Sequence, residues 1–195
     1  MKLSTKKVAI FGTSADPPSN GHKLIIEELS NIYDLVICYA SNNPSKKHEE
    51  NLFFRSLLLE TLINNLSSNK IKFDQDMSSP WAIETIKRCK KKYMCKYIDF
   101  VIGSDLLAEI CLWKNIIEFL KEVKLLIIPR EDFPINPKNI NFIKNNFGRF
   151  EISKLKVPRI SSSMIRMNKT YEGLPKSVIS IIENNRLYNY PKINK

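Results

Sequence analysis

The chain has 195 residues, of which 43% are hydrophobic, and its formal net charge is +11. This length suits a single domain with one sizeable core. No apolar run approaches the roughly 18 residues of a membrane span, and the apolar segment near the N-terminus is too short for a signal peptide, which argues against membrane and secreted proteins. We therefore expect a cytoplasmic protein, with the nucleus as the alternative compartment.

Three explanations fit the positive charge: nucleic-acid binding, attraction of polyphosphate substrates, and a compositional bias towards Lys, Asn and Ile. The lysine runs at 46–47 and 90–92 are short and separated, unlike a dense nucleic-acid-binding arm. Compositional bias therefore ranks first, a phosphate substrate second and nucleic acid last.

Short apolar runs alternate with longer amphipathic segments through the first two thirds of the chain. Near-continuous hydrophobicity predicts strands at residues 8–11, 35–40, 97–103 and 125–129, with a weaker one at 71–73. Helical periodicity predicts helices at residues 22–33, 52–64 and 81–93, and a broken one over 105–122. This order predicts a Rossmann-like, doubly wound α/β fold whose mostly parallel sheet has five or six strands.

The composition changes towards the C-terminus, where Pro and Asn mark loops. We expect a short helix at 138–146, a last strand at 150–154 and an amphipathic helix at 176–185. The chain is predicted to form one domain over residues 1–195, with a Rossmann-like core (1–133) and a C-terminal part (134–195) that includes a short helical segment. Loops that follow parallel strands meet at one edge of the sheet, where we expect the ligands.

The junction between the first strand and the first helix is the most informative segment. Residues 12–22 read Gly-Thr-Ser-Ala-Asp-Pro-Pro-Ser-Asn-Gly-His, and His22 is one of only two histidines in the chain. Unpaired N–H groups at a helix start attract anions. Neither a G-x-G-x-x-G nor a Walker-type sequence is present. The junction therefore predicts a phosphate site of another kind.

This segment resembles the (His/Thr)-x-Gly-His signature of the nucleotidyltransferase superfamily, whose members transfer nucleotidyl groups to phosphates and related acceptors. Ser19 stands where the first histidine of the signature is usual. The resemblance implies that His22 bonds to the α-phosphoryl oxygens, helped by the Ser19 hydroxyl. It also implies that the ATP-binding residues of this segment are Gly12, Thr13, Ser14, Gly21 and His22.

Residues 160–166, Ile-Ser-Ser-Ser-Met-Ile-Arg, resemble the second signature of this superfamily, Ile-Ser-Ser-Thr-x-Ile-Arg. Hydroxyl and N–H groups at a helix start suit phosphate oxygens, and a guanidinium one turn later adds fixed charge. The resemblance implies a catalytic role for Arg166. It further implies that ATP phosphates bind to Ile160, Ser161, Ser162, Ser163 and Arg166.

Smaller matches indicate one branch of the superfamily. Residues 101–105, Trp113 and residues 127–130 resemble the Ile-Gly-x-Asp…Trp…Pro-Arg series of the nicotinate-nucleotide adenylyltransferases, and residues 80–85 and 42–47 resemble two of their further segments. The resemblance implies that ATP also binds to Gly103, Ser104 and Asp105. It implies a mononucleotide site, with Trp113 stacking on the pyridine ring, made by Ser14, Lys46, Lys47, Trp81, Thr85, Trp113 and Arg130.

Two residues beside these motifs receive separate expectations. His48 follows two lysines in a polar loop, which favours a solvated side chain. Arg55 lies on the helix after that loop and is expected either to touch phosphate or to remain a surface charge. The cysteines form no C-x-x-C pair and have no neighbouring histidine, which predicts reduced, buried thiols and no metal site at Cys38, Cys89, Cys95 and Cys111.

The reaction implied by the resemblance joins ATP and nicotinate mononucleotide into nicotinate adenine dinucleotide and pyrophosphate, a step of NAD biosynthesis. Mg²⁺ is expected with ATP, without a prosthetic group and without a nucleic-acid or membrane partner; a homo-oligomer is compatible with the sequence. The alternatives are phosphopantetheine or another acceptor, and a non-enzymatic basic nucleic-acid-binding module. The motifs favour nicotinate over nicotinamide but leave that choice open.

Overall fold

The structure of the protein is a computed structural model that describes residues 6–190. Six strands form one sheet in the order β3-β2-β1-β4-β5-β6, and every neighbouring pair is parallel. The strands are β1 Val8–Thr13, β2 Leu35–Ala40, β3 Ile71–Phe73, β4 Ile98–Gly103, β5 Lys124–Ile128 and β6 Arg149–Ile152. The predicted doubly wound α/β fold with a five- or six-stranded sheet is confirmed.

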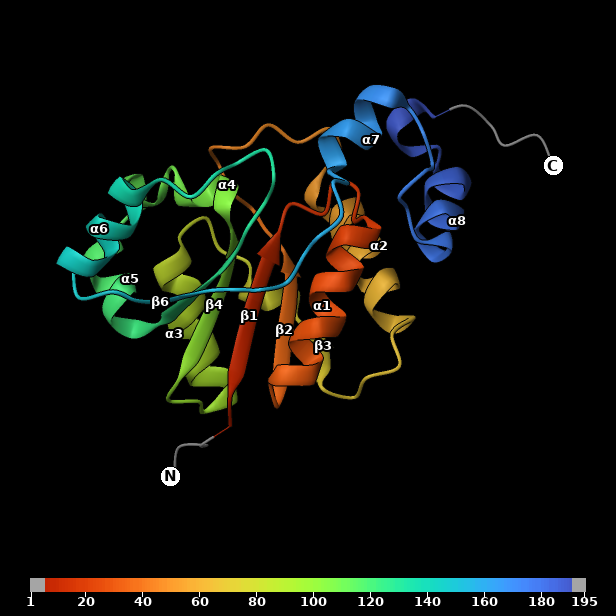
Figure 1. The fold of residues 1–195 in the computed structure, drawn as a ribbon. Coiled ribbons are helices and arrows are strands. Elements are labelled where there is room, and N and C mark those ends of the chain that lie inside the picture. The colour runs from red at the N-terminus through yellow and green to blue at the C-terminus, as the bar shows by residue number, and fades with distance from the viewer. Residues whose placement is uncertain (1–5, 191–195) are drawn as a thin grey trace.

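Helices cover both faces of this sheet (Figure 1). They are α1 Asn20–Ile32, α2 Leu52–Asn64, α3 Ala82–Tyr93, α4 Ser104–Leu107, α5 Ile116–Glu122, α6 Pro137–Asn145, α7 Ser162–Asn168 and α8 Lys176–Asn185. Three short 3₁₀ turns occupy Gln75–Met77, Ile110–Leu112 and Leu187–Asn189. Within residues 6–190, every helix is too short or too polar to cross a lipid bilayer.

The alternation of side chains along the strands explains their continuous hydrophobicity. Ala9 and Phe11 face one core, with α1, α2 and α8, whereas Val8 and Ile10 face the other, with α3 and α5. Because successive side chains of a strand point to opposite faces, a strand covered on both sides needs apolar residues at every position. The same packing buries three of the four cysteines, while Cys111 is exposed, which corrects the prediction for that residue.

Several predicted boundaries differ from the structure for local reasons. Helix α1 begins at Asn20 rather than His22, because Ser19 is its N-cap, with extended backbone. The broken helix over 105–122 is α4, a 3₁₀ turn and α5, separated where Asn115 adopts a left-handed φ of 55°. The last strand ends at Ile152, two residues before the predicted end.

The strand order reverses at β1, which pairs with β2 on one side and β4 on the other. In an open parallel sheet such a reversal opens a crevice at the carboxyl ends of the strands, because the adjacent connections leave towards opposite faces. Figure 1 shows the chain after β6 crossing the sheet to place α7 beyond this edge. The N-terminal and C-terminal motifs are therefore brought together at the crevice.

Candidate active site

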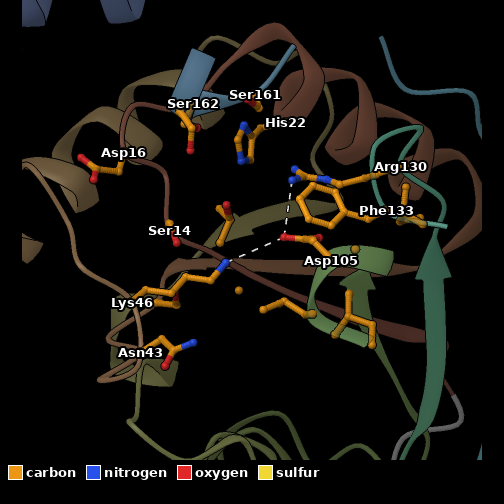
Figure 2. Close-up of a pocket in the computed structure, with 18 of the residues that line it drawn as sticks. Ser14, Asp16, His22, Asn43, Lys46, Asp105, Arg130, Phe133, Ser161 and Ser162 are labelled. Carbon is orange, nitrogen blue, oxygen red and sulfur yellow. Dashed lines mark ion pairs between the residues drawn. The ribbon is translucent and has the colours of Figure 1, made fainter. Parts of the chain in front are cut away.

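A cavity of about 670 Å³ lies at this edge of the sheet, a size typical of small-molecule sites. Figure 2 shows side chains from the β1–α1 loop, the loop after β2, the starts of α4 and α7, and the end of β5 around it. The predicted site residues that line it are Gly12, Thr13, Ser14, His22, Lys46, Lys47, Gly103, Asp105, Arg130, Ser161, Ser162, Ser163 and Arg166.

The His22 ring is buried at the wall of this cavity, and its Nδ1 is engaged by Ser19. The backbone N–H of Ser19 donates to Nδ1 at 3.0 Å, and the Ser19 hydroxyl lies 2.9 Å from the same atom. Burial, together with the positive charges of Arg130 and Lys46, lowers the pKa of His22 to about 3. The neutral ring accepts at Nδ1 and therefore carries its proton on Nε2, as a hydrogen-bond donor.

Ser19 is fully buried and does not line the cavity. Its hydroxyl contacts the His22 ring from the side away from the cavity. Together, the Ser19 side chain, the backbone of α1 and the His22 ring form a capping box. Ser19 is thus a positioning residue for the imidazole.

The role of the Ser19 hydroxyl is tested by Ser19→Ala. We expect turnover to fall less than about tenfold, since the backbone N–H of residue 19 still donates to Nδ1 and keeps the tautomer of His22. Steady-state kinetics with ATP as the varied substrate measure the change. A loss as large as that of His22→Ala would instead place the Ser19 hydroxyl on the substrate.

Asp16 links the loop after β1 to the loop after β2 and to α7. Its buried carboxylate accepts the backbone N–H groups of Glu49 at 2.8 Å and Glu50 at 3.2 Å. The Arg166 guanidinium donates to the Asp16 carbonyl and lies 3.7 Å from its carboxylate, with Nε 3.2 Å from a Glu49 oxygen. Arg166 is therefore held at the cavity by fixed partners, and Asp16, which belongs to the first signature, was missing from the predicted site.

Arg55 is neither a phosphate contact nor a surface charge. It is only 2% exposed and donates to three carbonyls, those of Ser14 at 2.7 Å, Ser41 at 2.9 Å and Glu50 at 3.1 Å. It also lies close enough to Asp16 for the opposite charges to interact. Arg55 thus joins the loop after β1 to the loop after β2, and both loops line the cavity.

His48 is half-buried and lines the cavity, which corrects its predicted solvation. Its Nδ1 lies 3.7 Å from an Asp16 carboxylate oxygen. Burial, followed by the nearby charge of Arg55, lowers the pKa of His48. A histidine in a polar loop of the sequence gives no sign of this burial, because the covering groups come from other segments.

Asp105 lines the cavity and lies between two cations. Its Oδ2 is 3.8 Å from the Lys46 ammonium and 3.5 Å from the Arg130 guanidinium, as the dashed lines in Figure 2 mark. A Cβ at Gly103 would come within 2.2 Å of Oδ1 of Asp105, so any larger residue there would displace this carboxylate. Ser104 is buried outside the cavity and accepts the backbone N–H of Arg130 at 2.9 Å, which positions that residue.

A second cavity of about 400 Å³ adjoins the first and shares Gly12, Asn43 and Glu109 with it. Trp81 and Trp113 both line it, in accordance with their expected place in one pocket. Arg130 and the two lysines of the predicted mononucleotide site line the first cavity instead. A Cβ at Gly12 would meet the ring of Tyr39 at 2.4 Å, so only glycine fits at the boundary of the two cavities.

Besides Ser19 and Ser104, three predicted residues lie outside both cavities. Thr85 is fully buried, and its hydroxyl donates to the carbonyl of Met77 at 2.9 Å. Gly21 packs against the backbone of Ile160. A Cβ at Gly21 would lie 3.4 Å from the Ile160 carbonyl oxygen. Together with the bond of 2.8 Å from the Ser162 hydroxyl to the Pro17 carbonyl, this contact packs the two signatures against each other.

Comparison with known proteins supports the family that the two signatures indicate. A family model described as cytidylyltransferase-like matches residues 10–168. The Bacillus subtilis nicotinate-nucleotide adenylyltransferase is 26% identical over 196 residues, covering 94% of this chain and 98% of that protein. A Synechocystis protein named as a probable nicotinate-nucleotide adenylyltransferase is 28% identical over 197 residues, covering 93% and 98%.

Among solved structures, a Plasmodium falciparum nicotinic acid mononucleotide adenylyltransferase complexed with NaAD has a TM-score of 0.76 at 22% identity, covering 95% of this chain and 98% of that one. The fold is therefore shared along almost the whole length. The family predicted from the two signatures is confirmed. The chain belongs to the cytidylyltransferase-like family of nucleotidyltransferases.

Proposed function

We propose that the protein is a nicotinate-nucleotide adenylyltransferase, which transfers AMP from ATP to the 5′-phosphate of nicotinate mononucleotide and releases pyrophosphate. The observation that carries this proposal is the pair of adjoining cavities. One has cationic and hydrogen-bond-donating walls, with His22 and Arg166, and the other is lined by two tryptophans. Polyphosphate suits the first and an aromatic ring suits the second.

The chemistry requires alignment and charge stabilisation more than proton removal. The 5′-phosphate of the acceptor already carries a nucleophilic oxygen, so no strong base is needed. The neutral His22 would donate from Nε2 to an α-phosphoryl oxygen, where negative charge grows in the transition state. Arg166 and the hydroxyls of Ser161 and Ser163 would bind the leaving pyrophosphate.

The role of Asp105 follows from its two cations. Lys46 and Arg130 flank its carboxylate at 3.8 Å and 3.5 Å, and all three side chains line the phosphate cavity. We propose that Asp105 and Gly103 bind the adenosine, while the two cations turn towards phosphate when substrates enter. The ion pairs with Asp105 would then keep both cations in place before binding.

Mg²⁺ is proposed to arrive with ATP and to neutralise charge on its phosphates. Within residues 6–190, no group of three or more His, Cys, Asp and Glu side chains could hold a metal ion. The Asp16 carboxylate is occupied by backbone amides, and Asp105 by two cations. The ion would therefore be bound chiefly by phosphate oxygens and water.

The direct test is release of pyrophosphate from Mg-ATP with one acceptor at a time. Nicotinate mononucleotide should give rapid release together with nicotinate adenine dinucleotide. Release with 4′-phosphopantetheine alone would support the other acceptor that the sequence leaves open. Oligonucleotide binding that weakens steeply with salt, without thermal stabilisation by Mg-ATP, would support a nucleic-acid-binding protein instead.

Trp113 is expected to support the pyridine ring. In Trp113→Ala, we expect the KM for nicotinate mononucleotide to rise about tenfold while the KM for ATP changes little, since stacking on an aromatic side chain contributes about 1–3 kcal/mol. Trp113 also packs edge-on against Phe100, with ring centroids 6.2 Å apart, so Trp113→Phe serves as the control that retains part of this packing. An unchanged KM for the mononucleotide in Trp113→Ala would assign Trp113 to packing alone.

A further inference from the structure

The tryptophan-lined cavity has one positive and one negative side chain, and they occupy different parts of it. Among its lining residues, Lys114 is the single cation and Glu109 the single carboxylate. Glu109 also lines the phosphate cavity, so it lies where the two cavities join. Lys114 lines the second cavity but not the first, and its ammonium lies 4.6 Å from the centre of the Trp81 ring.

In the part of the chain that the structure describes, neither charge is paired with an opposite one. No ion pair within residues 6–190 involves the Lys114 ammonium or the Glu109 carboxylate, and both residues are exposed. The contact of Lys114 with Trp81 places its charge against an aromatic wall without pairing it with an anion. The cavity therefore has a negative side chain towards the phosphate site and a positive one at the tryptophan end.

This arrangement of charges matches nicotinate mononucleotide, the acid, better than nicotinamide mononucleotide, the amide. The ring nitrogen joined to ribose is a cation in both mononucleotides, and it must lie towards the phosphate cavity because the ribose phosphate extends there. Only the acid has a carboxylate on the far side of the ring, whereas the amide is neutral at that position. Glu109 can attract the ring cation of both compounds, while Lys114 has a charged partner only in the acid.

We propose that Lys114 is the side chain that makes the enzyme prefer the pyridine carboxylate to the carboxamide. This inference rests on the proposed function, since it assigns specificity within the same site. The Lys114 ammonium would pair with the carboxylate of a ring held between Trp81 and Trp113. Glu109 would orient the ring by attraction to its positive nitrogen and would not distinguish acid from amide.

The test compares kcat/KM for nicotinate mononucleotide and nicotinamide mononucleotide, each with saturating Mg-ATP, in the wild type and in Lys114→Gln. We expect the acid-to-amide ratio to fall about tenfold, because a hydrogen bond to a charged group is lost for the acid alone. Lys114→Glu should lower the ratio further by repelling the carboxylate. Both substitutions are at an exposed position, and thermal unfolding checks that the fold is retained.

Lys121→Gln is the matched control, since its ammonium lies 5.8 Å from the ring centre of Phe147, outside both cavities. It should leave the ratio at the wild-type value, and Glu109→Gln should lower kcat/KM for both mononucleotides by a similar factor. A ratio within twofold of wild type in both Lys114 variants would overturn the proposal while leaving the proposed function intact. Failure of the wild-type protein to form a dinucleotide from either mononucleotide would instead overturn the function itself, and this inference with it.

Discussion

Replacement of His22 by alanine is expected to lower turnover about 10²–10³-fold, the scale for losing one donor that acts in the transition state. The affinity for ATP should change much less, because charge on the α-phosphoryl oxygens grows only as the reaction proceeds. Single-turnover and steady-state rates with Mg-ATP and nicotinate mononucleotide measure the effect. Near-normal turnover in this variant would remove His22 from the mechanism.

The protonation state of His22 gives this prediction a second part. Since burial and two nearby cations lower its pKa to about 3, the ring stays neutral across the working pH range. We therefore expect no inflection in turnover near pH 6.5 from His22. An inflection there that disappears in His22→Ala would mean that the ring acts as an imidazolium.

His22→Gln is the informative companion variant. A glutamine amide can place a neutral N–H donor near the position of Nε2 but cannot accept the Ser19 backbone N–H as the imidazole does. We expect it to recover about tenfold of the activity lost in His22→Ala, in line with the contribution of a single hydrogen bond. Equal activity of the two variants would show that an uncharged donor at this position is not what the reaction needs.

Replacement of Arg55 by alanine is expected to give the largest loss of stability, about 3–5 kcal/mol in the free energy of unfolding, the scale for breaking a buried charged network. The guanidinium donates to the carbonyls of Ser14, Ser41 and Glu50, and all three would lose their partner. The buried Asp16 would also lose a nearby positive charge. Urea denaturation followed by circular dichroism measures the change.

Arg88→Ala is the control for Arg55. Arg88 also donates to two backbone carbonyls, those of Asp76 at 3.0 Å and Ser78 at 2.5 Å, but it is exposed, so water can replace it. We expect this control to cost less than about 1 kcal/mol. A similar cost for both variants would mean that burial of Arg55 contributes little, and that the loops after β1 and β2 are held mainly by other contacts.

The predicted elements follow the structure closely where the signals are local. The ranges 35–40, 52–64 and 71–73 agree with β2, α2 and β3 at both ends. Apolar periodicity and turn residues depend on neighbours in the chain, so they can be recognised without the fold. The start of α1 is the instructive exception, because the predicted helix began at His22, whereas Ser19 caps the helix and Asn20 is its first residue.

The site was predictable as two segments but not as a cavity. The signatures around His22 and Arg166 identified residues that line the larger cavity, and Trp81 and Trp113 identified the second cavity. The orientation of the residues behind those walls was not visible, as Ser19, Thr85 and Arg55 show. Their side chains are buried against backbone from other segments, or against a neighbouring ring in the case of Ser19.

The sequence by itself determined the family, the order of strands and helices, and the two signature segments that line the larger cavity, because these depend on residue types at short spacing. Only the tertiary structure decided which side chains face the ligand cavities. The proposed role of Lys114 depends on the fold, which places its ammonium over the ring of Trp81, 33 positions earlier in the chain. The pKa of His22 and the role of Arg55 both depend on burial. The atoms that bury these side chains come from distant parts of the chain, so local sequence patterns cannot predict them.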